Sequence, residues 1–144
     1  MFIGEYQHTI DQKNRLAVPI KFREALQDGL IITRGIDECL FIYPKETWQL
    51  LAEKIAALPF YQADNRAFSR LMLAGAMEVE IDNQGRILLP GYLKNYGKLK
   101  TKIVVAGVYD RLEIWDSRIW QEYKNKTESS AEEIASRVGE MLTG

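Results

Sequence analysis

The chain has 144 residues, a formal net charge of −1 and a hydrophobic fraction of 47%. This length allows one or two small domains, and this composition is typical of a globular protein and excludes a disordered one. No apolar run approaches the roughly 18 residues that a membrane span requires, and the N-terminus lacks the basic region and apolar core of a signal peptide. A single cysteine, Cys39, excludes an intrachain disulfide framework and fits a reducing compartment, so we expect a cytoplasmic protein.

One short motif occurs twice, beginning at Asp11 and again at Asp82. Each copy has Asp, two variable residues, Asn or Gly, Arg, three apolar residues and Pro. Other positions match in the same order, with one residue inserted late in the second copy: Gly4 with Gly75, Ile10 with Ile81, Gly35 with Gly107, Leu40 with Leu112, Ile42 with Ile114, Tyr43 with Trp115, and Trp48 with Trp120. The sequence therefore predicts two copies of one unit, residues 4–48 and 75–120.

Each copy predicts the same series of elements. Residues 5–10 and 76–81 are expected strands, and the Asp that follows can accept a backbone N–H two residues on. Asn14 and Gly85 tolerate the left-handed conformation, which fits a type I turn with a bulge. Residues 15–18 and 86–89 are the expected return strands, and Pro19 and Pro90 are each expected to open a short helix. Strands follow at 30–33 and 103–105, and last strands at 39–43 and 111–115.

The remaining segments have helical patterns. Between the copies, one helix is expected from Pro44 to Pro59 and another over about 62–73. After the second copy, Asp116 is expected to cap a helix, and residues 130–133 have the pattern of a capping box for a final helix. We therefore predict a helical connector over 49–74 and a C-terminal helical tail over 121–144, whose apolar stripes serve as core or subunit contacts.

A unit of about 45 residues is marginal as an independent domain, so the two copies are expected to share one core. The predicted fold class is α+β, mainly β. The expected architecture is a pseudo-two-fold small β-barrel flanked by helices.

The sequence offers little catalytic chemistry. His8 is the only histidine, expected on an exposed or edge strand, and Cys39 is expected to be half-buried in a strand. No metal-ligand spacing or phosphate-binding glycine loop is present, so we predict no enzyme, no metal and no cofactor. Asp11 and Asp82 resemble a pair of catalytic carboxylates, but each has an Arg four residues on, and an ion pair within its own hairpin is the better interpretation.

Charge is unevenly distributed along the chain. Residues 1–36 and 81–109, which contain the hairpins, are net positive, whereas residues 37–80 and 110–144 are net negative. This asymmetry indicates a polyanionic partner on one face, or else ordinary scatter over solvated surfaces. The Asp/Arg motif has two compatible interpretations: the pair braces the turn, or Asp orients Arg so that Arg and Lys13 face phosphates or base edges.

The chain resembles the MraZ family of bacterial transcriptional regulators, whose halves are SpoVT/AbrB-like domains. The resemblance is carried by Asp11 with Arg15, by Asp82 with Arg86, by the apolar residues and Pro after each Arg, by the opening residues 1–4 (Met-Phe-Ile-Gly), and by a Trp-containing segment after each unit. It covers nearly the whole chain except about the last 15 residues.

The resemblance implies a barrel of two swapped hairpins and a ring-like homo-oligomer. It also implies binding to double-stranded promoter DNA with short direct repeats, at the nucleoid, usually repressing the division and cell-wall gene cluster and the protein's own gene. The implied DNA-binding residues are Lys13, Arg15 and Arg86, with Asp11, Asn14, Asp82 and Gly85 supporting the motif. Gln84 replaces Lys13 in the second copy, so we expect the first hairpin to contribute more.

The alternative is a ring-forming structural module that does not bind DNA. Neither interpretation requires a membrane or a small-molecule substrate.

Overall fold

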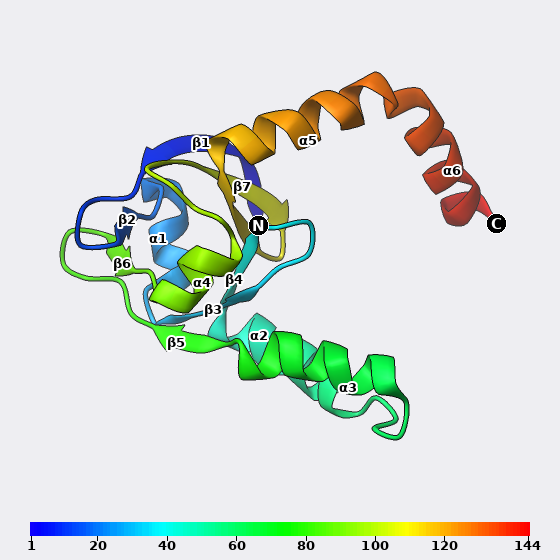
Figure 1. Cartoon of the computed structure of the whole chain (residues 1–144), viewed down its shortest axis with the longest axis horizontal. Helices are drawn as coiled ribbons and strands as arrows, with labels where there is room; N and C mark the ends of the chain where they lie inside the picture. The colour runs from blue at the N-terminus through cyan, green and yellow to red at the C-terminus, as the bar shows by residue number, and fades with distance from the viewer.

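The computed structural model describes residues 1–144, and it repeats one order of elements twice (Figure 1). Both copies run strand, short strand, helix, strand, strand, which confirms the predicted duplication. The first copy comprises β1 (Phe2–Thr9), β2 (Arg15–Ala17), α1 (Ile20–Leu26), β3 (Leu30–Arg34) and β4 (Leu40–Pro44). The second comprises β5 (Met77–Val79), β6 (Arg86–Leu88), α4 (Gly91–Tyr96), β7 (Lys102–Tyr109) and β8 (Leu112–Asp116).

The two copies exchange their first strands. The main sheet is antiparallel with the order β1-β7-β8-β4-β3-β5, so β1 pairs with β7 of the second copy and β5 pairs with β3 of the first. At the centre, β4 pairs with β8, and Phe41 lies opposite Glu113, its equivalent in the other copy. The short strands β2 and β6 form a separate sheet. The arrangement is pseudo-two-fold, and neither copy has a complete set of strands without the other.

The α+β class with two repeats is confirmed, but the strands do not close into a single barrel. Instead, they form the open six-stranded sheet and the two-stranded β2–β6 ribbon. The reason is the shortness of β2 and β6, which have three residues each and pair with one another. The only ladder contact near the first turn is the single bridge between Ile10 and Leu16.

The strand registers correct one match in the sequence alignment of the two copies. Leu30 lies opposite Pro44, and Ile103 lies opposite Asp116, so Leu30 and Ile103 are equivalent. Gly107 is therefore the counterpart of Arg34 and not of Gly35. The segment from the start of α4 to Ile103 is two residues longer than the segment from the start of α1 to Leu30, because extra residues lie in the loop before β7.

The main sheet buries both of its faces. Leu40 and Ile42 of β4 face the larger core, which also contains residues from β2, β6, α1 and α4. Phe41 and Tyr43 alternate with them and face a smaller core on the opposite side. The alternation has the period of two expected for a strand, and it places the β2–β6 ribbon on one side of the sheet and the connector on the other.

The connector and tail are helical, with two departures from expectation. α2 (Lys45–Ala56) matches the predicted first helix, but the second is divided into α3 (Ala63–Ser69) and a π-helical turn, η1 (Arg70–Ala74). In this turn, the Thr33 hydroxyl donates to the Met72 carbonyl at 2.7 Å, and Arg34 donates to the Leu71 carbonyl at 3.3 Å. Side chains of β3 therefore satisfy carbonyls in this widened turn.

The tail comprises α5 (Ser117–Ser129) and α6 (Ala131–Thr143), which extend away from the body of the molecule (Figure 1). Asp116 caps α5 as predicted, accepting from the Arg118 N–H at 3.2 Å. The Ser130 side chain makes no cap hydrogen bond, so the predicted capping box is not formed, although α6 does begin directly after Ser130. None of the helices has the length and apolar character needed to cross a membrane.

Candidate nucleic-acid interface

The first turn is held by one carboxylate that accepts three hydrogen bonds. Asp11 Oδ1 accepts from the backbone N–H of Lys13 at 2.8 Å and of Arg15 at 2.9 Å, and Asp11 Oδ2 accepts from Arg15 Nε at 2.7 Å. The chain reverses through Asn14, whose φ is 60°. The predicted Asx-type turn and the predicted Asp–Arg pair are both present, and they share the same Asp side chain.

The second turn repeats this geometry. Asp82 Oδ1 accepts from the backbone N–H of Gln84 and of Arg86, both at 2.9 Å, and Asp82 Oδ2 accepts from Arg86 Nε at 3.0 Å. Gly85 holds the left-handed position with a φ of 78°. The sequence difference between Asn14 and Gly85 therefore leaves the turn unchanged.

These hydrogen bonds stabilise the ionised form of each Asp. The backbone N–H of Arg15 is the largest cause that lowers the pKa of Asp11, and the Arg15 side chain and the Lys13 N–H lower it further. The backbone N–H of Arg86 likewise lowers the pKa of Asp82, followed by the Gln84 N–H. Both carboxylates are therefore charged at neutral pH, and each keeps its Arg in a fixed orientation.

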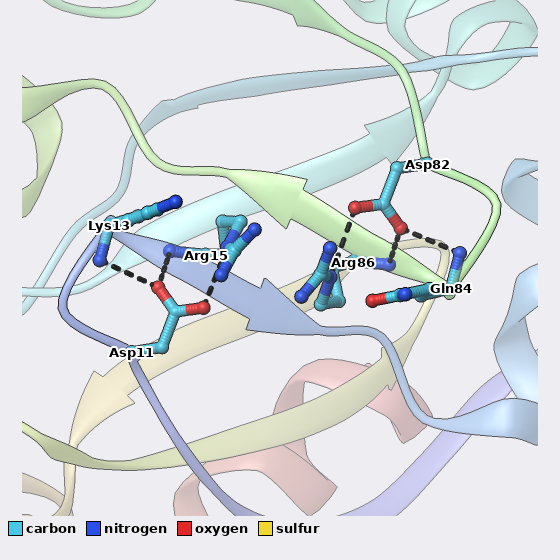
Figure 2. Close-up of polar contacts among 6 residues, drawn as sticks. All are labelled: Asp11, Lys13, Arg15, Asp82, Gln84 and Arg86. Carbon is cyan, nitrogen blue, oxygen red and sulfur yellow. Dashed lines mark hydrogen bonds and ion pairs between the residues drawn. The ribbon is translucent and has the colours of Figure 1, made fainter.

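The β2–β6 ribbon brings the two turns into one surface. Arg15 pairs with Leu88, and Ala17 pairs with Arg86, so these four side chains share one face of the ribbon. The other face carries Leu16 and Ile87, which are buried in the larger core. Figure 2 shows the turns at opposite ends of the ribbon, with the two Arg side chains between them. We call this face, made of Arg15, Ala17, Arg86 and Leu88, the outer ribbon face.

The outer ribbon face leaves part of each guanidinium without a partner in the protein. The side chains of Arg15 and Arg86 are 32% and 27% exposed. Each uses Nε to bind its Asp, and the Nη atoms of both make no hydrogen bond in the structure. Lys13 is exposed at the first turn, and Gln84 takes its place at the second. The arrangement presents oriented cationic donors, which suits recognition of an anion or of base edges.

The structure adds residues to this surface that the sequence analysis did not select. Leu88 is 60% exposed beside the two Arg side chains, and only the ribbon register reveals its position. Lys94 of α4 donates from Nζ to Asn14 Oδ1 at 2.8 Å. Its counterpart in the repeat, Arg23 of α1, lies against Gly85 of the other turn. Each short helix therefore supplies a cation to the turn of the opposite copy, a contact for which no local sequence signal exists.

His8 and Cys39 lie away from this surface. His8 is half-buried on β1, which is an edge strand as predicted, and burial lowers its pKa. Cys39 is completely buried and not half-buried as expected, because it faces the smaller core beside Met72 and Trp115. Its thiol donates to the Ile36 carbonyl at 3.1 Å, and burial raises its pKa. The two side chains belong to different parts of the fold.

Comparison with known proteins supplies independent evidence on the family. A family model described as "MraZ protein, putative antitoxin-like" matches residues 1–71 and again residues 72–140. A protein named Transcriptional regulator MraZ from Carboxydothermus hydrogenoformans is 48% identical over 142 residues, which cover 99% of each chain. The protein of the same name from Desulforamulus reducens is 49% identical over 142 residues, covering 99% of this chain and 100% of the relative. That from Moorella thermoacetica is 49% identical over 138 residues, 96% of each chain.

The family model matches twice, and its two matches each contain one Asp/Arg turn. The relatives match over nearly their whole length, so the similarity extends to the connector and most of the tail. With the duplicated turns, the exchanged strands and these matches in agreement, this chain belongs to the MraZ family.

Proposed function

We propose that this protein is a sequence-specific DNA-binding transcriptional regulator that contacts promoter DNA through the outer ribbon face and Lys13. The observation that carries the proposal is the pairing of β2 with β6, which places Arg15 and Arg86 on one face with their Nη atoms free. The relatives are named as transcriptional regulators, which supports the same function.

The ribbon has the physical properties that such contact needs. The DNA major groove is about 12 Å wide and admits a two-stranded β-ribbon. A guanidinium held at Nε by Asp keeps two nitrogens available for the O6 and N7 acceptors of guanine or for a phosphate. The exposed Leu88 can make apolar contact with a thymine methyl group. Lys13, at the tip of the first turn, is placed for a phosphate contact.

We further propose which DNA the protein binds and how it regulates transcription. The family resemblance supports binding to short direct repeats at the nucleoid, upstream of the division and cell-wall gene cluster and of the protein's own gene. It also supports repression of both. Several protomers acting together would bind repeated sites much more tightly than one protomer, because the later binding events are intramolecular.

Exposed apolar residues support a homo-oligomer. Met141 and Leu142 on α6 are 83% and 81% exposed, and Phe60 and Tyr61 are exposed in the loop between α2 and α3. Clustered exposed apolar side chains usually mark an interface. The same residues favour the second candidate function, an assembly module without DNA binding, and the experiment below separates the two.

The test is titration of a double-stranded fragment from upstream of the protein's own gene, alongside a scrambled fragment, at several salt concentrations. Wild type should prefer the promoter fragment, and its affinity should fall steeply with salt, because phosphate contacts release counterions. The Lys13→Ala/Arg15→Ala variant should lose most of this affinity while retaining the oligomeric state of wild type. Unchanged promoter affinity in that variant would overturn the hairpin mechanism, and absence of binding by wild type would leave the assembly module as the function.

A further inference from the structure

We propose that four lysines on α4 and in the segment leading into β7 form a DNA-phosphate surface with more free cations than the corresponding surface beside the second turn. These residues, Lys94, Lys98, Lys100 and Lys102, are called the lysine flank here. The inference rests on the proposed function and extends it, because it assigns a second contact surface and gives each protomer a direction on its DNA.

Two members of the lysine flank, Lys94 and Lys100, lie directly against the first turn. The backbone N–H of Ile10, the residue before Asp11, donates to the Thr101 carbonyl at 2.8 Å. Lys94 Nζ donates to Asn14 Oδ1 at 2.8 Å. Together these contacts form a shallow depression of about 450 Å³, whose polar lining comes from Asp11, Gln12, Asn14, Lys94, Lys100 and Thr101. A phosphate strand passing the first turn would therefore meet Lys100 next.

The second turn has an equivalent depression with different charges. Its lining contains Ile81, Asp82, Asn83 and Gly85, which are the counterparts of Ile10, Asp11, Gln12 and Asn14, and it adds Arg23, Glu24 and Gln27. Arg23 corresponds to Lys94, but the register counterpart of Lys100 is the neutral Gln27, and the acidic Glu24 also lines the second depression. The nearby loop before β3 also carries Asp28. The second depression is also smaller, at about 260 Å³, so the two repeats present a larger and more positive depression at the first turn than at the second.

Two members of the flank are free cations. Lys98 pairs with Glu38 at 2.9 Å, and Lys94 is engaged by Asn14. Lys100 and Lys102 are exposed and make no ion pair or side-chain hydrogen bond in the structure. Lys102 lies opposite Thr9 at the start of β7. Lys100 lies in the loop before β7 and Lys102 is the first residue of β7, and their register counterparts in the first copy are the uncharged Gln27 and Gly29.

The flank gives the pseudo-symmetric ribbon a direction. The two arginines of the outer ribbon face exchange places after a half-turn, so by themselves they fit a site in either orientation, and only Leu88 in place of Ala17 and Lys13 in place of Gln84 distinguish the two ends of the ribbon. Additional phosphate contacts on the side of the first turn make one orientation more favourable. Direct repeats require each bound protomer to point the same way, and the flank supplies that preference.

The experiment compares Lys100→Gln/Lys102→Gln with the matched control Lys54→Gln/Lys126→Gln. The control removes the same charge from exposed positions on α2 and near the end of α5, away from the ribbon (Figure 1). All four substitutions are at exposed side chains, and thermal melting and light scattering confirm folding and assembly. Each variant is titrated with the promoter and scrambled fragments between 50 and 200 mM salt.

Loss of two phosphate contacts should make the plot of log affinity against log salt less steep, by about 1.8 per engaged protomer. The ratio of wild-type affinity to flank-variant affinity should therefore be roughly tenfold larger at 50 mM than at 200 mM salt. The ratio should be similar on both fragments, because phosphate contacts carry no base sequence.

If the flank variant binds DNA as the control does, while Lys13→Ala/Arg15→Ala abolishes promoter binding, the lysine flank does not contact DNA. The proposed function then remains intact. An equal salt-slope change in the control variant also overturns the lysine-flank proposal, because the effect would then come from net charge alone. If wild type fails to bind the promoter fragment, both proposals fall together.

Discussion

Leu16 and Ile87 occupy equivalent positions in the two repeats, and they lie opposite each other across the β2–β6 pair, each 1% exposed. The pseudo-two-fold axis therefore passes between these two side chains. They anchor the ribbon to the larger core directly beneath the outer ribbon face. The same pair thus joins the core to the surface that we propose contacts DNA.

Truncation of this anchor should destabilise the whole fold. Leu16→Ala should lower the free energy of unfolding by roughly 2–5 kcal/mol, because it removes buried methyl groups and leaves a cavity. Ile87→Ala should cost a similar amount, since the environment is nearly symmetric. Urea denaturation followed by circular dichroism measures both. A loss below about 1 kcal/mol in either variant would show that the ribbon is not part of the cooperative core.

Truncation of the two ribbon arginines should have unequal effects on DNA binding. Arg15→Ala should cost roughly 1–3 kcal/mol per engaged site and reduce the preference for promoter over scrambled DNA. Arg86→Ala should cost less, because Gln84 at the second turn supplies no cation where Lys13 supplies one. Titration with both fragments measures the two losses. Equal losses would show that the hairpins contribute equally.

Acid should weaken the turns through their two carboxylates. The folded pKa values of Asp11 and Asp82 are lowered, so their contribution to stability is present above the unfolded pKa and is lost as pH falls through the folded pKa. Since an unfolded Asp titrates near pH 3.9, the loss should occur below about pH 4. The Asp11→Asn/Asp82→Asn variant should be less stable than wild type at pH 7, and the gap should narrow toward acid pH. Thermal melting from pH 7 to pH 3 measures this, and a constant gap would contradict it.

A side chain at Gly85 should destabilise the second turn. Its φ is 78°, and an added Cβ would overlap the Arg23 guanidinium unless that side chain moved. Gly85→Ala should therefore cost at least about 1–2 kcal/mol from the left-handed backbone alone. Gly91→Ala is the matched control, because an added Cβ there meets nothing within 4 Å. The melting temperatures of the two variants measure the difference, and equal stability would contradict a strained left-handed conformation at position 85.

The exposed end of α6 should contribute to the proposed assembly. Met141→Ser/Leu142→Ser should reduce the oligomer size without unfolding the protomer, because both side chains are largely exposed in it. Ala131→Ser/Ala135→Ser on the same helix serves as the control. Light scattering at micromolar concentration measures the mass, and an unchanged mass would exclude this end of α6 from the interface.

The sequence by itself determined the repeat, the chemistry of each turn and the start of the helices after Pro19 and Pro90. The repeat is visible in the sequence itself, and the turns and helix starts depend on residues within four positions of one another, as when Asp11 accepts from the N–H groups of Lys13 and Arg15. Local hydrogen bonding and backbone preference therefore suffice to predict them. The resemblance carried by the same turns was likewise enough to indicate the family.

Only the tertiary structure decided how the turns are combined. Residues far apart in sequence meet in the β2–β6 pair, in the exchange of β1 and β5, and in the contact of Lys94 with Asn14. The exposure of Leu88 beside the two arginines follows from the β2–β6 pairing. These positions depend on which strands pair to bury the shared core. The same pairing explains why the strands form an open sheet and a separate ribbon and not the closed barrel that we expected. The unequal charge beside the two turns is likewise visible only in the tertiary structure, because the sequence does not show that Lys94 and Lys100 lie against the first turn.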